Sequence, residues 1–446
     1  MSSLLSSSSV GLFTEQAFLS HLASQPASAP AWWIERKRSA FARFSELDMP
    51  SRTDEGWRFS SRETLTLEGF DASSTPPSDQ AAASIDLGEV AASLTFLDGV
   101  LTARTAVSAD LSSKGVVVGT LREALAHHAV LLREHFMAQP QKLGSEKFAA
   151  LHTAFVSDGA FIFVPKGVEL PAPIVVTHGS RGAGTRVFPH TLVVLEEQAK
   201  ATVIDLFLSP DRGAAPPNPG HPAAFACGAN DLYAGHGSQL VYAAAQLWSH
   251  DTLSFQLNST VVRRDARVQS LNLHLGGQQA RHESLSQLQA PGAFSEMLAV
   301  TIASGDQEFD QRTLQIHQAP NTKSDLLYKN ALLDTARTIF SGLIVVDPDA
   351  QKTDAYQSNR NLMLSDTAEA SSLPGLEIQA NDVRCTHGAT SSRIDPEQMF
   401  YLESRGISPT KARELLVFGF FEEVLNRLEN DSLHGLLRSF LQTHFH

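Results

Sequence analysis

The chain has 446 residues, 42% of them hydrophobic, and a formal net charge of −13. That hydrophobic content excludes a disordered chain, and the length predicts several structural units or one long core. The acidic balance excludes binding to nucleic acid through a basic surface. No window approaches the roughly 18 apolar residues of a membrane-spanning helix, so we expect no membrane association.

The two cysteines, Cys227 and Cys385, exclude a disulfide framework and favour a reducing compartment. The N-terminal sequence MSSLLSSSSVGLF has neither a basic region nor a continuous apolar stretch, so no signal peptide is expected. We therefore expect a cytoplasmic protein.

Residues 1–153 are predicted to form a mainly helical N-terminal region with one sheet-like patch. One helix is expected at about 30–47, and another begins at Thr120, which forms a capping box with Glu123. The Ser/Pro/Ala-rich stretch at 71–84 is typical of a linker.

Residues 154–394 carry one short β-rich run after another, and most of the runs end in Gly, Asp, Asn, Pro or Ser. The spaces between the runs are too short for crossover helices, which excludes a doubly wound sheet. A single sandwich usually ends well short of ~240 residues, whereas a solenoid has no such limit. We therefore predict a β-solenoid core, with a surface loop at 210–224.

Residues 395–446 are predicted to form a C-terminal helical domain. Ser408 is a good N-cap and Pro409 a good first helical residue, and a second amphipathic helix is expected from about residue 431. The phenylalanines of the first helix cover more of its surface than one contact requires. They either complete the core or form a partner-docking patch: Phe418, Phe420 and Phe421.

Signature motifs of several enzyme classes are absent: the sequence has no GxxxxGK[ST], GxSxG, HExxH or CxxC. An iron–sulfur cluster normally needs about four soft ligands, which two cysteines cannot supply. A cluster on this chain would have to be completed by histidine, by carboxylates or by another subunit.

The best metal-ligand candidates are Cys385 and His387, in the sequence RCTHG. On a strand, side chains at positions i and i+2 lie on the same face, so this thiol and this imidazole could reach one metal ion. Gly388 would allow close approach of a cofactor or another backbone. The alternative is a buried, inert cysteine beside a hydrogen-bonded structural histidine.

The stretch from Tyr328 to Gly406 resembles the SufB/SufD family of iron–sulfur cluster assembly proteins. It contains YKNALLDTARTIFSGLIVV, DAQKTDAYQSNRNLMLS, LPGLEIQANDVRCTHGATSSRID and EQMFYLESRGIS. IHQAPNTKSD, AFVSDGAFIFVPKGV and the N-terminal PSRTDEGWRF also fit, so the resemblance covers roughly 30–430.

This resemblance implies a right-handed parallel β-helix between an N-terminal helical region and a C-terminal helical domain. It implies a scaffold that is not an enzyme, pairs with a SufB-like paralogue and binds a SufC-like ATPase through its C-terminal helices. A transient iron–sulfur cluster would form at the subunit interface, and the chain alone would bind none tightly.

Two differences from SufB-like members favour the SufD-like branch of the family. SufB-like members carry a cysteine where this chain has Asn359, and a Glu-flanked histidine where it has CTHGAT. The resemblance then implies that His387 lies at the interface and helps to hold the cluster. SufB would supply the thiolate, Cys385 would assist, and Phe418–Phe421 would lie near the SufC contact.

Two alternatives remain. The chain could act as a homodimeric scaffold without SufB, pairing edge to edge with itself. It could also be a polysaccharide-active β-helix enzyme, which would need a row of Asp residues along a groove and secretion. The Asp residues fall mostly in turns, so this second alternative is the weaker one.

Overall fold

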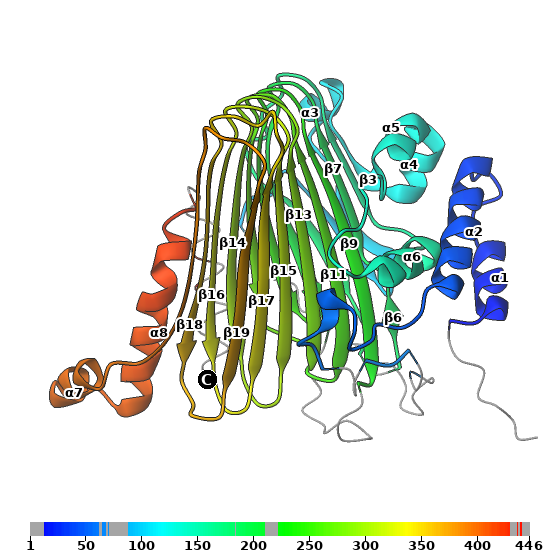
Figure 1. The fold of residues 1–446 in the computed structure, drawn as a ribbon. Coiled ribbons are helices and arrows are strands. Elements are labelled where there is room, and N and C mark those ends of the chain that lie inside the picture. Colours follow the sequence, from blue (N-terminus) through cyan, green and yellow to red (C-terminus); the bar gives the residue numbers. More distant parts are fainter. Residues whose placement is uncertain are drawn as a thin grey trace, which may run out of the picture.

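The computed structural model describes residues 13–61, 65–67, 70, 88–182, 184–209, 222–428, 435 and 438. These residues form a long β-solenoid with helices at both ends of the stack (Figure 1). The linker predicted at 71–84, almost all of the loop at 210–224 and almost all of the helix expected from 431 lie outside the described residues.

Two sheets face each other along the solenoid. Sheet A has, in spatial order, β2 (Val100–Thr105), β1 (Ala92–Leu97), β5 (Ile174–Gly179), β8 (Lys200–Leu208), β10 (Gln239–Leu247), β12 (Arg267–His274), β14 (Phe294–Ala303), β16 (Lys323–Leu332), β18 (Asp354–Met363) and β20 (Arg384–Arg393). Sheet B has β19 (Glu369–Ile378), β17 (Arg337–Val346), β15 (Glu308–His317), β13 (Gln279–Leu288), β11 (Thr252–Val262), β9 (Ala224–Ala234), β7 (His190–Leu195), β4 (Ala160–Val164) and β3 (Val117–Thr120), with the short β6 (Arg186–Val187) beside β9.

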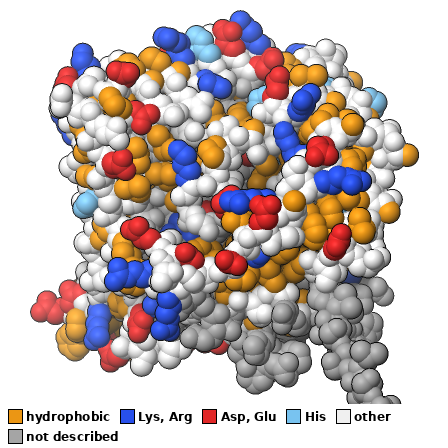
Figure 2. Space-filling model, turned by 45° about the vertical axis from the view of Figure 1, so that its right-hand side comes forward, with side chains coloured by type: hydrophobic (Ala, Val, Ile, Leu, Met, Phe, Trp, Pro, Cys, Tyr) orange, Lys and Arg blue, Asp and Glu red, His pale blue; other side chains and the backbone are white. Residues whose placement is uncertain are grey.

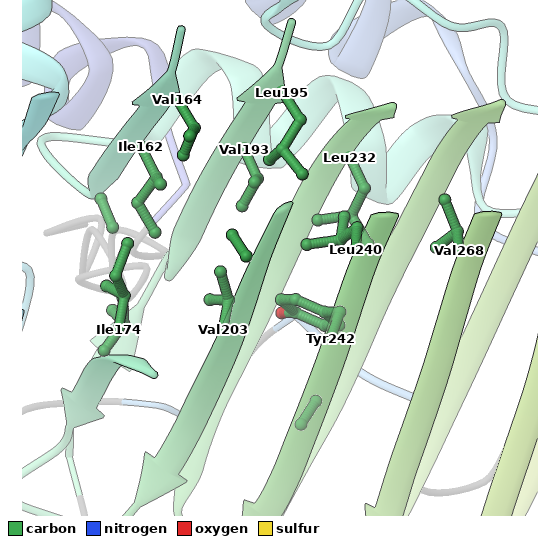
Figure 3. Close-up of a cluster of buried hydrophobic side chains, with 14 of the residues drawn as sticks. Ile162, Val164, Ile174, Val193, Leu195, Val203, Leu232, Leu240, Tyr242 and Val268 are labelled. Atoms are coloured by element: carbon green, nitrogen blue, oxygen red, sulfur yellow. The ribbon is translucent and has the colours of Figure 1, made fainter. Parts of the chain in front are cut away.

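From β7 onward, consecutive strands alternate between the two sheets, so each turn of the chain adds one strand to each sheet. The strands pair in parallel except at one end, where β2 pairs with β1 and β3 with β4 in antiparallel fashion. Apolar side chains from both sheets fill the space between them, as Figure 3 shows for Val193 and Leu232 opposite Val203 and Leu240. The predicted β-solenoid is confirmed.

The helices of the N-terminal region precede or flank the first strands. They are α1 (Glu15–Ala23), α2 (Ala31–Glu46), the 3-10 turn η1 (Glu55–Trp57), α3 (Ala109–Ser113), α4 (Leu121–His127), α5 (Ala129–His135) and α6 (Glu146–Phe155). The helix expected at 30–47 and both hydrogen bonds of the capping box at Thr120 are confirmed. The chain leaves the helix at His128 (φ −132°, ψ 34°), whose ring stacks on Phe161, so two short helices follow the box.

The N-terminal PSRTDEGWRF segment is fastened to the outer face of sheet B. The guanidinium of Arg281 lies 3.8 Å from the centre of the Trp57 ring and donates to Gly56 O at 3.0 Å. Trp57 Nε1 donates to Gly144 O at 2.9 Å, and Arg281 also pairs with the buried Glu283 at 2.7 Å. This buried network, in which every charge has a partner, joins the N-terminal region to the solenoid.

Two helices follow the last strand: α7 (Pro396–Ser404) and α8 (Pro409–Leu425). The Ser408 side chain accepts from Lys411 N, as expected of the N-cap. Helix α8 packs on the outer face of sheet A (Figure 1), where Lys329 Nζ lies 2.6 Å from a Glu423 carboxylate oxygen. Its inward face contacts a set of apolar sheet residues through Val417, Phe421, Val424 and Leu425, and Leu428, just after the helix, joins the same cluster. Among the described residues no helix is long and apolar enough to cross a membrane.

One buried carboxyl inside the solenoid predicts a pH dependence of stability. Asp205 is fully buried; its Oδ2 accepts from Tyr242 Oη at 2.7 Å, and its Oδ1 lies 3.5 Å from Nε2 of the buried His178. Burial raises the pKa of Asp205 to about 7. The folded chain therefore keeps a proton that the unfolded chain releases above about pH 4, so this group's contribution to stability falls as pH rises towards 7.

Asp205→Asn mimics the protonated acid and should remove that loss. We expect the free energy of unfolding of wild type to fall relative to the variant by about 2–3 kcal/mol between pH 5 and pH 8. Denaturant unfolding at both pH values measures this, with Asp382→Asn on the surface as the control. A wild-type-to-variant difference that is the same at both pH values would contradict it.

Candidate functional site

The two ends of the solenoid differ. At the first end the antiparallel strands β2 and β3 finish the sheets, whereas the second end finishes on the parallel strands β20 and β19. In the described part of the chain, β20 pairs only with β18, and β19 only with β17. Most β20 side chains are exposed. We call this end, formed by β19 and β20, the open end; Figure 1 shows it beside α8.

The sequence candidates Cys385 and His387 both lie on β20, in this last turn. In the parallel ladder Cys385 is in register with Ala355, and His387 with Gln357. Ala355 and Gln357 are both buried inside the solenoid. The thiol and the imidazole therefore lie on the inward-facing side of β20. Within the described residues no further turn covers this side, and His387 is exposed.

The two candidates differ in how ready they are to bind metal. Cys385 is half-buried against a small apolar cluster that includes Ile344 and Ala355, and burial raises the pKa of its thiol, with the nearby Asp354 carboxylate adding to the effect. A metal would have to displace that proton. The ring of His387 has no hydrogen-bond partner among the described residues, so its nitrogens are accessible.

The ligand set of this end is incomplete. No group of three or more His, Cys, Asp or Glu side chains placed to hold a metal ion occurs within the described residues. Cys385 and His387 thus provide two donors on one strand, and a four-ligand cluster needs others.

A hydrogen-bonded ladder of buried amides lies directly beneath the open end, and it was not predicted from the sequence. Asn361 Nδ2 donates to Asn359 Oδ1 at 3.0 Å and to Thr390 O on β20 at 3.3 Å. The Asn361 Oδ1 accepts from Asn330 of the preceding turn at 2.8 Å. The alternating polar residues Gln357, Asn359 and Asn361 on a strand were the available signal, since buried amides need partners.

The three phenylalanines predicted to form a docking patch differ in how deeply they are buried. Phe421 is fully buried against sheet A, whereas Phe418 and Phe420 are half-buried in the same contact. Among the described residues of this domain, the exposed aromatic side chains are on α7 instead: Phe400 is 73% and Tyr401 56% exposed. Sequence reasoning did not single out α7, because its few apolar residues form no helical stripe.

A surface cavity of about 580 Å³ separates α7 from the ends of β18 and β20. Apolar residues of both sides line it, among them Met363, Ile394 and Met399, together with the charged Arg393 and Arg413. The face of the molecule that carries the N-terminal helices has acidic and basic side chains interspersed (Figure 2).

Comparison with known proteins identifies two family descriptions in this chain. "SUF system FeS cluster assembly, SufBD core domain" matches residues 176–420, and "SufBD protein N-terminal region" matches residues 16–176. The core match covers both strands of the open end and α8 as far as Phe420.

Individual relatives agree with these matches. An iron–sulfur cluster assembly SufBD family protein of Synechocystis is 30% identical over 91% of this chain and 89% of its own length. The SufD protein of Bacillus subtilis is 28% identical over 97% of this chain and 98% of its own. The SufB protein of the same bacterium is 26% identical over 72% of this chain and 67% of its own.

Proposed function

The chain belongs to the SufBD family of iron–sulfur cluster assembly proteins, and we propose that it is a SufD-like, non-catalytic scaffold subunit. In this proposal it works in the cytoplasm, pairs with a SufB-like paralogue, and binds a SufC-like ATPase through its C-terminal helices. A nascent cluster forms at the interface of the two paralogues. The longer match to a SufD than to a SufB from one organism favours the SufD-like branch.

The open end is the observation that carries this proposal. In a parallel ladder, successive residues direct their backbone groups to opposite sides of the strand. Arg384 N donates to Thr353 O, so the even-numbered residues of β20 direct theirs towards β18. The odd-numbered residues, including Cys385, His387 and Ala389, therefore direct their backbone N–H and C=O groups away from β18. An unpaired row of this kind is a template for a strand of another chain. A strand added there would bring a partner's ligands beside His387.

The incomplete ligand set fits a shared site. The cluster is the cargo of the assembly, and this chain would offer the imidazole of His387, with the thiol of Cys385 as a second donor. The partner would supply the remaining ligands, including a thiolate, which suits iron in a cluster.

A second copy of this chain is the alternative occupant of the β20 edge. Mixing the purified chain with its SufB-like paralogue and measuring molar mass by light scattering distinguishes the two. We expect the heterodimer to replace any homodimer, and the SufC-like ATPase to join it. A homodimer that persists in excess paralogue would overturn the heterodimeric assignment.

The ATPase contact should depend on α7. Phe400 is 73% exposed and lies beside the surface cavity, so Phe400→Ser removes apolar contact area without disturbing the core. We expect the affinity for the SufC-like ATPase to fall by roughly tenfold or more, as for a central aromatic contact residue. Titration of the ATPase subunit by calorimetry measures it.

Val130→Ser on α5 is the matched control, because Val130 is 71% exposed at the other end of the chain. Equal affinities for the two variants would exclude α7 from the contact. Phe421→Ala is not a suitable test, since loss of that buried ring would destabilise α8 itself.

A further inference from the structure

One proline lies inside a strand of the open end. Of the chain's 21 prolines, Pro374 is the only one that falls within a strand of the described residues, and it lies near the middle of β19. Proline has no N–H, so inside a sheet it is tolerated essentially only on an edge strand or at a bulge. In the described part of the chain β19 is such an edge, because it pairs only with β17.

The register shows that Pro374 removes no hydrogen bond from its own sheet. Glu369 N, at one end of β19, donates to Ala336 O at 3.0 Å. Gln379 N, just beyond the other end, donates to Val346 O at 2.9 Å. Since successive residues of a parallel ladder direct their backbone groups to opposite sides, the odd-numbered residues of β19 bond towards β17. Pro374 is even-numbered, so its nitrogen faces the free edge, where only an incoming strand would use an N–H.

The two strands of the open end therefore present different edges. On β20 every residue that directs its backbone outwards keeps its N–H: Cys385, His387, Ala389, Ser391 and Arg393. On β19 the corresponding outward residues are Ala370, Ser372, Pro374, Leu376 and Ile378. An added strand could form a continuous ladder along β20, whereas along β19 the ladder would break at its centre, where the proline ring also obstructs the approaching backbone.

The side chains of the two strands match this difference. Strand β19 has exposed apolar side chains: Leu373 is 37% and Ile378 41% exposed. A free edge with exposed apolar side chains pairs readily with other chains, and natural proteins protect such edges with proline among other means. Strand β20, with the sequence RCTHGATSSR, is mostly polar or small. The protected edge is thus the more apolar one, and the polar edge is left free.

We propose that Pro374 is a specificity-determining residue of the open end: it closes the edge of β19 to strand addition and so directs a partner's strand to β20. It also prevents a second copy of this chain from pairing through sheet B. The inference rests on the proposed function for the identity of the partner on β20. The protection of β19 concerns this chain alone and is tested without the partner.

The first test uses the purified full-length chain by itself. Pro374→Ala restores the outward N–H, and we expect self-association, measured by sedimentation over a range of concentrations, to become tighter by about tenfold or more. Pro348→Ala is the matched control, because Pro348 is in an exposed turn between β17 and β18 and not on a free edge. Equal self-association of Pro374→Ala, Pro348→Ala and wild type would overturn the inference.

A double variant identifies the strand that pairs. Pro374→Ala combined with Ala389→Pro opens the edge of β19 and obstructs that of β20. We expect this variant to self-associate more tightly than Ala389→Pro alone. If the two do not differ, the copies pair through β20, and Pro374 does not protect β19.

Hydrogen exchange of the wild-type chain bound to its SufB-like paralogue needs no variant. By mass spectrometry of peptides, we expect the fast-exchanging amides of β20 to become protected and those of β19 to keep exchanging. Equal protection of both strands would overturn the inference, even if Pro374→Ala does not fold. If neither strand is protected while Pro374→Ala self-associates, the proposed interface on β20 fails and the protection of β19 stands.

Discussion

Replacement of His387 by alanine is expected to lower cluster formation on the reconstituted complex by at least tenfold and to leave the complex intact. Loss of a residue that merely supports a metal ligand already costs 10- to 100-fold in metal affinity, and loss of the ligand should cost no less. The imidazole is exposed and makes no hydrogen bond within the described residues, so its removal should not destabilise the fold. The absorption of the cluster during anaerobic reconstitution measures the yield.

His236→Ala is the control for this variant. His236 is another exposed histidine, its Nε2 3.7 Å from an Asp265 carboxylate oxygen, and it lies at a turn away from β20. Cys385→Ala should have a smaller effect than His387→Ala, because burial raises the pKa of the Cys385 thiol and disfavours the thiolate. If the cluster yield is unchanged in His387→Ala while the subunits still bind each other, His387 is not a ligand of the cluster.

The strands that could be predicted from the sequence are those in which apolar residues dominate. Runs such as PIVVTH and TIFSGLIVV correspond to β5 and β17. The polar strand β13, QARHESLSQL, could not be predicted, although every residue in it is buried. Its inward side faces polar neighbours, as where the His282 ring stacks on His274, and its outward side carries Arg281 and Glu283 beneath the N-terminal segment. Burial there follows from tertiary hydrogen bonding, which an apolar pattern does not reveal.

The candidate site was predictable to a similar, partial extent. The spacing of Cys385 and His387 on a strand correctly implied a shared face. Nothing local in the sequence indicates that β20 is the last strand of sheet A, because that depends on where the chain turns helical. The position of Gln357 in register with His387 was also hidden, since it follows from the pairing of residues thirty positions apart. Pairing of this kind is visible only once the register is known.

Proline at Ala389 is expected to prevent pairing with the SufB-like partner. The Ala389 N–H points away from β18, so proline removes a donor that only an incoming strand would use, and no bond within the sheet is lost. The proline ring would also obstruct the partner's backbone. A cost of about 3 kcal/mol, the size of the penalty for proline inside a helix, corresponds to an affinity loss of about a hundredfold.

Ala389→Ser is the matched control, because it changes the side chain but keeps the N–H. Light scattering and surface-based binding measure the loss, while the unfolding midpoint of the single chain should stay close to that of wild type. Ala389→Pro should also lose cluster formation, but for a different reason than His387→Ala, which keeps the complex. If Ala389→Pro still pairs normally with the partner, the free edge of β20 is not the interface. The ligands that complete the site would then have to approach His387 from the interior face of the last turn instead.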